Sequence, residues 1–273
     1  CLIIWFSNKD ALSVLSNESF SSNFDSFYPS KELNIFSNID FNDVDIWFPI
    51  LHGLNGEDGS MQGLFKISQK PFLGAGILGS ATAMDKIASK ILLSYSKIPQ
   101  VKYFPIQNIN LDNDITFNNI CNQIIEYLKF PLFIKPANSG SSIGISKVNN
   151  KSQIFTAIQK AWEFDKRIIV EEGIKARELE CGVIGNVDLE TSEIGEVVYT
   201  SDWYDYNSKY SSNSKIIIPA RIDLDTKKRI QALTIKSCRA LNINGFARAD
   251  FFLEKDTNKL YLNEINTIPG FTS

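Results

Sequence analysis

Two apolar segments near the end of the chain carry acidic and amide side chains, Gly245-Phe246-Ala247-Arg248-Ala249-Asp250-Phe251-Phe252-Leu253 and Leu260-Tyr261-Leu262-Asn263-Glu264-Ile265-Asn266. Both are typical of β-strands, in which successive side chains point to opposite faces. Alternation places Arg248 and Asp250 on one face of the first strand. It also predicts that Leu262, Glu264 and Asn266 share one face of the second strand.

These polar strand residues predict a cation site. A buried carboxylate without a partner is costly, so Asp250 and Glu264 require a compensating positive charge. Carboxylate and amide oxygens are hard ligands, and they suit Mg²⁺ that bridges phosphates better than zinc. Arg248 beside them offers a forked donor to a phosphate or an oxyanion. A purely structural network of arginine and carboxylates is the alternative at this point.

A loop of small residues, 138–144, lies between predicted strands at 131–136 and 143–148. Its backbone N–H groups can approach a phosphate closely. It is not a Walker A loop, because the chain contains no GxxxxGK[ST] motif and the loop enters a strand. A plain hairpin turn stays possible, but Lys135 at the end of an apolar strand favours an anion.

A second glycine motif, Gly74-Ala75-Gly76-Ile77-Leu78-Gly79, matches GxGxxG. Dinucleotide binding also needs an acidic residue at the end of a second strand, about 20 residues further on. The chain has Ile98-Pro99-Gln100 there, so we do not assign a dinucleotide site.

The remaining patterns predict an α/β region followed by two α+β lobes. The apolar run 44–51 is typical of a parallel strand. A helix is predicted after Thr82, which would form a capping box with Asp85, and Ser152 is predicted to cap another helix. We place domain boundaries at 1–78, 79–171 and 172–273.

Composition excludes several classes of protein. The formal net charge is −3, so we expect no nucleic-acid partner. The apolar runs are too short to span a membrane. A single histidine and four scattered cysteines do not make a zinc site, and they are typical of a reduced, cytoplasmic protein. The chain begins without methionine and stops soon after a Pro-Gly turn, so we expect a fragment cut at both ends.

With these features in place, the sequence resembles the D-alanine–D-alanine ligase family over nearly its whole length. The resemblance implies an ATP-grasp fold with an N-terminal Rossmann-like (pre-ATP-grasp) domain. The matching stretches are Leu51-His52-Gly53 through Gly56-Glu57-Asp58-Gly59, Gln62-Gly63, Met84-Asp85-Lys86, Ile134-Lys135-Pro136, Ser139-Gly140-Ser141-Ser142, Tyr204-Asp205-Tyr206, Lys209-Tyr210, and Glu264-Ile265-Asn266-Thr267-Ile268-Pro269-Gly270-Phe271-Thr272-Ser273.

The resemblance also implies roles for individual residues. Those implied to bind ATP are Lys86, Lys135, Ser142 and Lys209 at the phosphates, Glu171, Glu172 and Ile174 at the adenine, and Glu178 at the ribose. Those implied to hold two Mg²⁺ ions, which Mn²⁺ can replace, are Asp250, Glu264 and Asn266. Those implied to act in catalysis or to hold D-alanine are Arg248, Ser141, Tyr210, Gly270 and His52. A hydrogen-bonded loop histidine is the alternative for His52.

The implied reaction joins two D-alanines for peptidoglycan precursors. ATP phosphorylates the first carboxylate, and the second amine attacks the acyl phosphate. Residues 202–214 are expected to close the site, and the family leads us to expect a cytoplasmic homodimer. The family's glycine-rich segment with its substrate-binding glutamate, a later serine and the closing helix are missing, so we expect this fragment to fall short of full turnover.

Three rival functions stay open. The nearest is a sibling ligase that joins D-alanine to D-lactate or D-serine, although Lys209-Tyr210 resembles the D-alanine-selective pattern. Another is an ATP-grasp ligase for a different acid and amine. A non-catalytic ATP-binding module is the third, and it would be expected to lack one of the three metal ligands.

Overall fold

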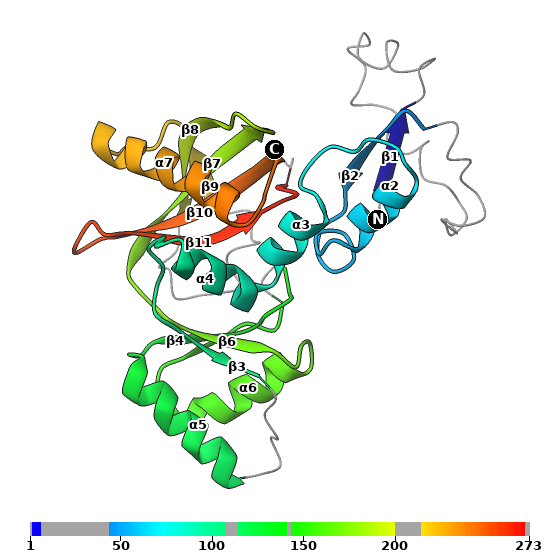
Figure 1. Ribbon diagram of the computed structural model, residues 1–273. Helices are drawn as coiled ribbons and strands as arrows, with labels where there is room; N and C mark the ends of the chain where they lie inside the picture. Colours follow the sequence, from blue (N-terminus) through cyan, green and yellow to red (C-terminus); the bar gives the residue numbers. More distant parts are fainter. Residues whose placement is uncertain (1, 7–43, 108–113, 141–142, 200–213, 271–273) are drawn as a thin grey trace.

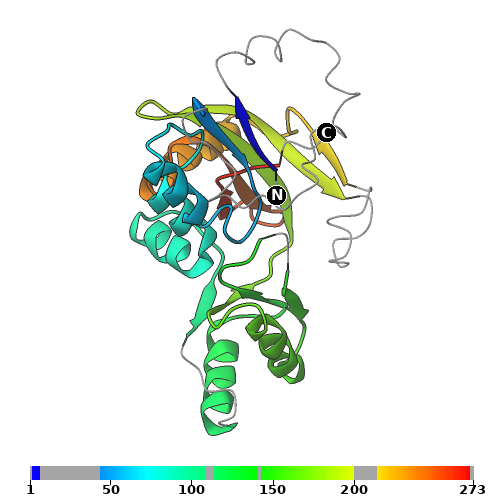
Figure 2. The ribbon, with the colours of Figure 1, turned by 90° about the vertical axis from the view of Figure 1, so that its right-hand side faces the viewer.

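The computed structural model describes residues 2–6, 44–107, 114–140, 143–199 and 214–270. These ranges form a five-stranded and a four-stranded sheet that face each other, and a two-stranded sheet near the N-terminus (Figures 1 and 2). The strands are β1 (Leu2–Phe6), β2 (Ile46–Ile50), β3 (Tyr103–Ile106), β4 (Leu132–Pro136), β5 (Ser146–Val148), β6 (Ile168–Glu172), β7 (Ala176–Gly185), β8 (Glu190–Tyr199), β9 (Ser214–Ile217), β10 (Gly245–Glu254) and β11 (Leu260–Asn266). The helices are α2 (Ser60–Ile67), α3 (Ile77–Met84), α4 (Lys86–Tyr95), α5 (Asp114–Tyr127), α6 (Ile154–Trp162) and α7 (Leu224–Ala240), with a 3₁₀ turn at Lys151–Gln153.

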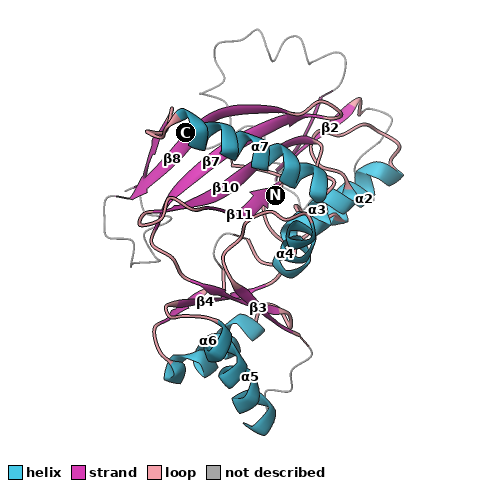
Figure 3. Cartoon of the chain, turned by 60° about the vertical axis from the view of Figure 1, so that its left-hand side comes forward, coloured by secondary structure: helices cyan, strands magenta, loops and turns pink. Residues whose placement is uncertain are grey.

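The large sheet has the strand order β11-β10-β7-β8-β9, and all its pairs are antiparallel. Helix α7 lies along its outer face (Figure 3). Alternate residues of β10 enter the core on that face, among them Ala247, Ala249 and Phe251. Arg248 and Asp250 therefore lie on the inner face, which is turned toward the small sheet.

Strand β11 carries a β-bulge that the sequence pattern did not predict. Phe251 pairs with Leu262, but its neighbour Asp250 pairs with Glu264, so Asn263 is an extra residue. Leu262 is consequently buried in the core, whereas Glu264 is only partly buried. The prediction that Leu262 shares a face with Glu264 was wrong, because strict alternation fails across a bulge.

The small sheet has the order β3-β6-β4-β5 and rests on α5 and α6 (Figure 1). Leu132 and Ile134 of β4 enter the core beneath these helices, so Lys135 points to the other face. In β6, Ile169 packs against Ile87 of α4. Glu171 lies two residues further along β6 and therefore on this same face.

The N-terminal region is held by aromatic packing. Trp47 of β2 stacks on Phe65 of α2 with ring centroids 5.1 Å apart, and Phe72 packs on Phe65. Strand β2 pairs antiparallel with β1, and only a single parallel bridge joins Trp47 to Phe72. The run 44–51, whose pattern is typical of a parallel strand, thus has a parallel bridge to Phe72 but pairs antiparallel with β1. Burial alternates along β2, so one face of the strand is fully buried and the other is only partly covered.

Two helix starts differ from prediction. Asp85, not Thr82, caps α4, because its carboxylate accepts the N–H groups of Ile87 and Ala88 at 3.0 and 2.9 Å. Thr82 lies inside α3, where its hydroxyl donates to the carbonyl of Leu78. Ser152 lies in the 3₁₀ turn and donates to Asn150, so it does not cap α6.

The GxGxxG motif allows α3 to pack closely against the segment that follows α7. It enters α3, and Gly79 lies against the backbone after α7, where an added Cβ would be 2.6 Å from the Asn242 carbonyl oxygen. Ala83 and Leu93, from α3 and α4, contribute to the core of the large sheet. The predicted division at residues 78 and 171 stays a prediction. In the described part of the chain, every helix falls short of the length and apolarity needed to cross a membrane.

Candidate active site

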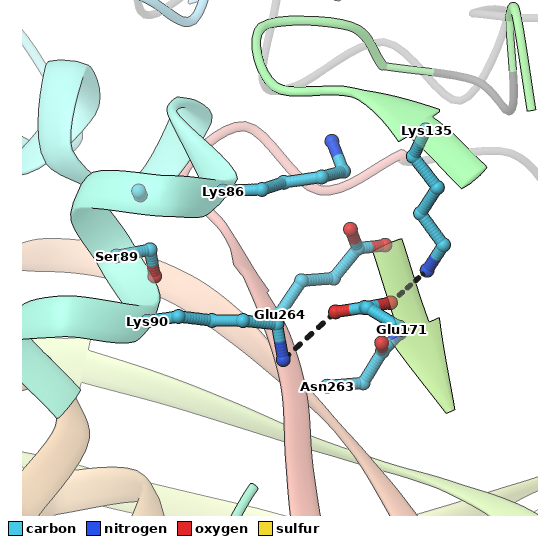
Figure 4. A pocket seen from close by; sticks show the side chains of 8 residues that line it. Lys86, Ser89, Lys90, Lys135, Glu171, Asn263 and Glu264 are labelled. Carbon is cyan, nitrogen blue, oxygen red and sulfur yellow. Dashed lines mark hydrogen bonds and ion pairs between the residues drawn. The ribbon is translucent and has the colours of Figure 1, made fainter. Parts of the chain in front are cut away.

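A pocket between the two sheets and α4 brings together four of the predicted site residues, namely Lys86, Lys135, Glu171 and Glu264 (Figure 4). The other residues that line it are Ala83, Ser89, Lys90 and Asn263. The pocket thus combines three lysines with two carboxylates. Such a mixture can accept a polyanion while keeping each buried charge compensated.

Glu171 is clamped between two lysines. Its Oε1 lies 2.8 Å from Lys90 Nζ, and its Oε2 accepts a short hydrogen bond from Lys135 (Figure 4). Burial raises the pKa of the Glu171 carboxyl, but the charges and hydrogen bonds of Lys135 and Lys90 outweigh it and hold the pKa well below the usual range. Glu171 is therefore a carboxylate at neutral pH.

Lys86 approaches the same pocket from the first turn of α4. Its Nζ donates to the backbone carbonyl of Ser139 at 2.6 Å, so it is tied to the glycine loop that follows β4. Burial lowers the pKa of Lys86, and the nearby Glu264 opposes this shift. The loop expected to cradle phosphates and the lysine expected to bind them are thus adjacent.

A second group of polar residues lies on the inner face of the large sheet. Asp250 accepts two hydrogen bonds from Arg248, at 2.7 and 2.8 Å, and one from Asn266 Nδ2 at 2.9 Å. Strand register places Glu264 directly opposite Asp250. The predicted partners Arg248, Asp250, Glu264 and Asn266 therefore occur together.

Glu180 joins this group from β7, although the sequence analysis did not select it. It pairs with Asp250 across the sheet, and its Oε1 lies 3.5 Å from Arg248 Nε. Glu180, Asp250 and Glu264 thus form a row across three adjacent strands. Burial raises the pKa of Asp250 to about 7, with the two other carboxylates adding to the effect and Arg248 opposing it.

The side chains of Asp250, Glu264 and Asn266 are chemically suited to a hard divalent cation. They offer oxygens from two carboxylates and an amide on neighbouring strands, which are the ligands that Mg²⁺ prefers. Arg248 occupies both oxygens of Asp250, so it would have to share them with an ion. Among the described residues, histidine, cysteine and carboxylate side chains alone form no metal-binding group of three or more. The proposed set therefore relies on Asn266, whose amide nitrogen donates to Asp250 in this structure.

The loop that contains His52 reaches this region through Glu57. The Glu57 carboxylate accepts the N–H of Gly53 at 2.6 Å and is also hydrogen-bonded to the backbone of Ile268. Burial raises the pKa of Glu57, and Glu264 adds to this shift while His52 opposes it. His52 itself is exposed. Glu57 therefore links the loop that contains His52 to the segment that follows β11. The sequence pattern had not predicted a role for Glu57.

The stretch expected to line adenine begins at Glu171 and runs between β6 and β7. The backbone N–H of Lys129 donates to the Glu172 carboxylate at 3.1 Å, and Ile174 is half-buried. A Cβ on Gly173 would lie 2.8 Å from the Phe133 ring and 2.9 Å from the Pro131 carbonyl oxygen. This crowding gives a physical reason for glycine at position 173.

The remaining predicted site residues either do not line this pocket or lie outside the described residues. Glu178 lies on β7 opposite Phe252, and Gly270 is exposed at the end of the described chain. Ser141, Ser142, Lys209 and Tyr210 lie outside the described residues, as does nearly all of the predicted closing loop at 202–214. Their assigned roles stay predictions.

Solved structures with the same fold show which class of protein this chain belongs to. The chain is similar to the VanG D-Ala:D-Ser ligase from Enterococcus faecalis, with 40% identity and a TM-score of 0.75 over 85% of this chain and 66% of that one. It is also similar to the D-alanine-D-alanine ligase from Coxiella burnetii, with 30% identity and a TM-score of 0.71 over 84% and 60%. The fold is the ATP-grasp fold, and the chain is an ATP-dependent ligase.

Two models of one protein family match most of the chain. The model described as "D-ala D-ala ligase N-terminus" matches residues 6–75, and "D-ala D-ala ligase C-terminus" matches residues 92–273. A curated D-alanine--D-alanine ligase of Prochlorococcus marinus subsp. pastoris is 57% identical over 99% of this chain and 77% of its own length. The chain therefore belongs to the D-alanine–D-alanine ligase family.

Proposed function

We propose that this protein joins two D-alanine molecules to D-alanyl-D-alanine with ATP, through an acyl phosphate, for peptidoglycan precursor synthesis. One observation carries the proposal: the lysine pocket and the carboxylate row occur at one place between two ATP-grasp sheets. They share Glu264, which lines the pocket and faces Asp250. Family membership and 57% identity to a ligase of this name support the choice of D-alanine.

In this proposal the lysines receive the nucleotide. Lys86 and Lys135 bind phosphate oxygens together with Ser142 and Lys209, while Glu171, Glu172 and Ile174 line the adenine and Glu178 meets the ribose. Lys86 is already held beside the glycine loop by its hydrogen bond to Ser139. A fixed ammonium group needs little rearrangement when a phosphate arrives, which favours binding.

Asp250, Glu264 and Asn266 would hold two Mg²⁺ ions, which Mn²⁺ can replace in an oxygen site. The ions, when bound, neutralise the phosphate charge. The protein's own share is electrostatic: Arg248 and the backbone of Gly270 stabilise the negative charge that develops when the amine attacks. Ser141, Tyr210 and His52 orient the D-alanines. A homodimer in the cytoplasm completes the proposal.

The chemistry explains why ATP is required. A carboxylate is a poor electrophile, so the first D-alanine is converted to an acyl phosphate by transfer of the γ-phosphoryl group. The amine of the second D-alanine then attacks the acyl carbon, the C–N bond forms, and phosphate leaves with the C–O electron pair. Positioning and charge neutralisation do most of the work in such transfers.

Phosphate release tests the proposal. We expect the full-length protein to release phosphate from ATP only when D-alanine and Mg²⁺ are both present, with the dipeptide detected by mass spectrometry. Parallel reactions pair D-alanine with D-serine or D-lactate, because the E. faecalis relative is named a D-Ala:D-Ser ligase. Faster turnover with either of these would refute the assignment of the second substrate. Phosphate release without any amino acid would refute ligation.

A further inference from the structure

Lys90 is a buried lysine to which the proposed reaction gives no task. It lies on α4 one turn after Lys86, and its side chain is 3% exposed. Burying an ammonium group is unfavourable unless an anion compensates it. Glu171, whose side chain is 5% exposed, is the compensating anion at 2.8 Å. The two groups meet only because α4 packs on the inner face of β6.

The second lysine on Glu171 differs in its surroundings. Lys135 binds the other oxygen, Oε2, and its side chain is 14% exposed, against 3% for Lys90. Lys135 is on β4 and faces the pocket where the phosphates are proposed to lie. Both lysines line this pocket, but Lys135 is the more exposed of the two, so we take Lys135 as the lysine that exchanges Glu171 for a nucleotide while Lys90 stays paired with Glu171.

We propose that Lys90 is a positioning residue that holds the Glu171 carboxylate through Oε1, so that Oε2 is presented to the exocyclic amino group of adenine when Lys135 turns to the nucleotide. This inference rests on the proposed function. It assigns the preference for adenine to an ion pair rather than to Glu171 alone.

The preference follows from hydrogen-bond chemistry. An ionised carboxylate only accepts hydrogen bonds, and the 6-amino group of adenine donates them. Guanine carries a carbonyl oxygen at that position, and two facing acceptors leave each other unsatisfied in a buried site. A Glu171 side chain that is free to rotate away, or to follow Lys135, would lose this discrimination.

Equilibrium binding tests the inference without turnover. The probes are the β,γ-imido analogues of ATP and GTP with Mg²⁺ in constant excess, titrated by calorimetry into the intact chain and its variants. For Lys90→Met we expect about tenfold weaker binding of the ATP analogue and a loss of about tenfold in the ATP-to-GTP affinity ratio. Lys90→Arg, which keeps the charge, should recover much of that ratio.

A double variant keeps the test valid if Lys90→Met folds poorly. Glu171→Gln removes the stranded anion, so Lys90→Met/Glu171→Gln should fold and should bind both analogues like Glu171→Gln alone. Additive losses from the two substitutions would overturn the inference, because they would mean that Lys90 and Glu171 act independently.

Arg177→Met is the matched control. It breaks an ion pair, Arg177 to Glu196 at 2.7 Å, that is partly buried and lies on the outer face of the large sheet, away from the pocket. It should lower thermal stability without changing the affinity ratio. If the unaltered chain prefers the ATP analogue and Lys90→Met keeps that preference, the inference fails alone. If the unaltered chain binds neither analogue, the proposed function fails with it.

Discussion

Asp250 is subject to opposing influences from its neighbours. Arg248 and Asn266 donate hydrogen bonds to its oxygens, whereas burial and the carboxylates of Glu180 and Glu264 disfavour its charge. A divalent cation between Asp250 and Glu264 would remove the repulsion between them. We therefore propose that a bound ion, rather than the arginine network alone, balances these carboxylates.

Removal of either carboxylate should consequently stop the reaction. For Asp250→Ala or Glu264→Ala we expect kcat to fall by at least about a hundredfold to a thousandfold, while ATP still binds. Phosphate release and analogue binding measure the two effects separately. Asp256→Ala, in the exposed turn between the same strands, is the control and should retain activity. Turnover that survives the loss of Asp250 would reject its metal role.

Glu180 offers a test of how Arg248 is held. If an ion draws on the Asp250 oxygens, Glu180 is the other carboxylate near the guanidinium, at 3.5 Å. Glu180→Gln should then lower kcat by about tenfold with little change in analogue binding, because the arginine is less well oriented in the transition state. Steady-state kinetics measure the effect. A change in KM for ATP with kcat intact would contradict this role.

Among the strands, the alternation of side chains predicted most of the residues of the site but not their exact arrangement. Alternation correctly placed Arg248 beside Asp250 in β10. It failed in β11, because nothing in the composition of that segment marks Asn263 as a bulge residue. The pairing of Glu180 with Asp250 was also hidden, since register between distant strands is set by tertiary packing.

Helices show the same limit. Asp85 and Thr82 both fit a cap, and only the break between α3 and α4 distinguishes them. Lys90 belongs to an amphipathic helix, and a lysine in such a helix is normally expected on the solvent-facing side. Its burial depends on Glu171, which is distant in sequence. Site residues that lie in family motifs could therefore be predicted from the sequence. Residues that join the site only through tertiary contacts, such as Lys90 and Glu180, could not.

The link between β6 and β7 carries a steric prediction. Gly173→Ala would place a methyl group against Phe133 and the backbone of Pro131, so we expect a loss of about 1–3 kcal/mol in the free energy of unfolding. Urea titration measures it. Gly63→Ala in α2 is the matched control, because nothing lies within 4 Å of its added Cβ. That helical substitution should be neutral or stabilising by up to about 1 kcal/mol.

At the scale of the whole molecule, the described cysteines report on the integrity of the core. Cys121, Cys181 and Cys238 are buried and free, and burial raises the pKa of each thiol, to about 12 for Cys238. We expect all three to resist iodoacetamide at about pH 8 in the folded protein and to react after unfolding. Peptide mass mapping identifies each site. Rapid labelling of Cys238 in the folded protein would contradict the fold.

The same thiol predicts an alkaline effect on stability. The folded pKa of Cys238 lies above its ordinary value of 9.0, so the unfolded state loses its proton first as pH rises. Stability from this group is complete below pH 9 and declines above it. In urea titrations, the free energy of unfolding of Cys238→Ala should decline less between about pH 9 and 10 than that of the unaltered protein. The cavity left by the substitution costs the same at each pH, so it does not affect this comparison. An equal decline in both proteins would refute this contribution.

The position of β11 has a consequence for synthesis on the ribosome. It follows the other strands of the large sheet in the chain and forms the edge of that sheet, yet it supplies Glu264 and Asn266. Proteins emerge from the N-terminus at about 5–20 residues per second, so Lys86, Lys90, Lys135 and Glu171 leave the exit tunnel before this strand does. A nascent or prematurely terminated chain would then lack two of the proposed metal ligands and could not consume ATP unproductively.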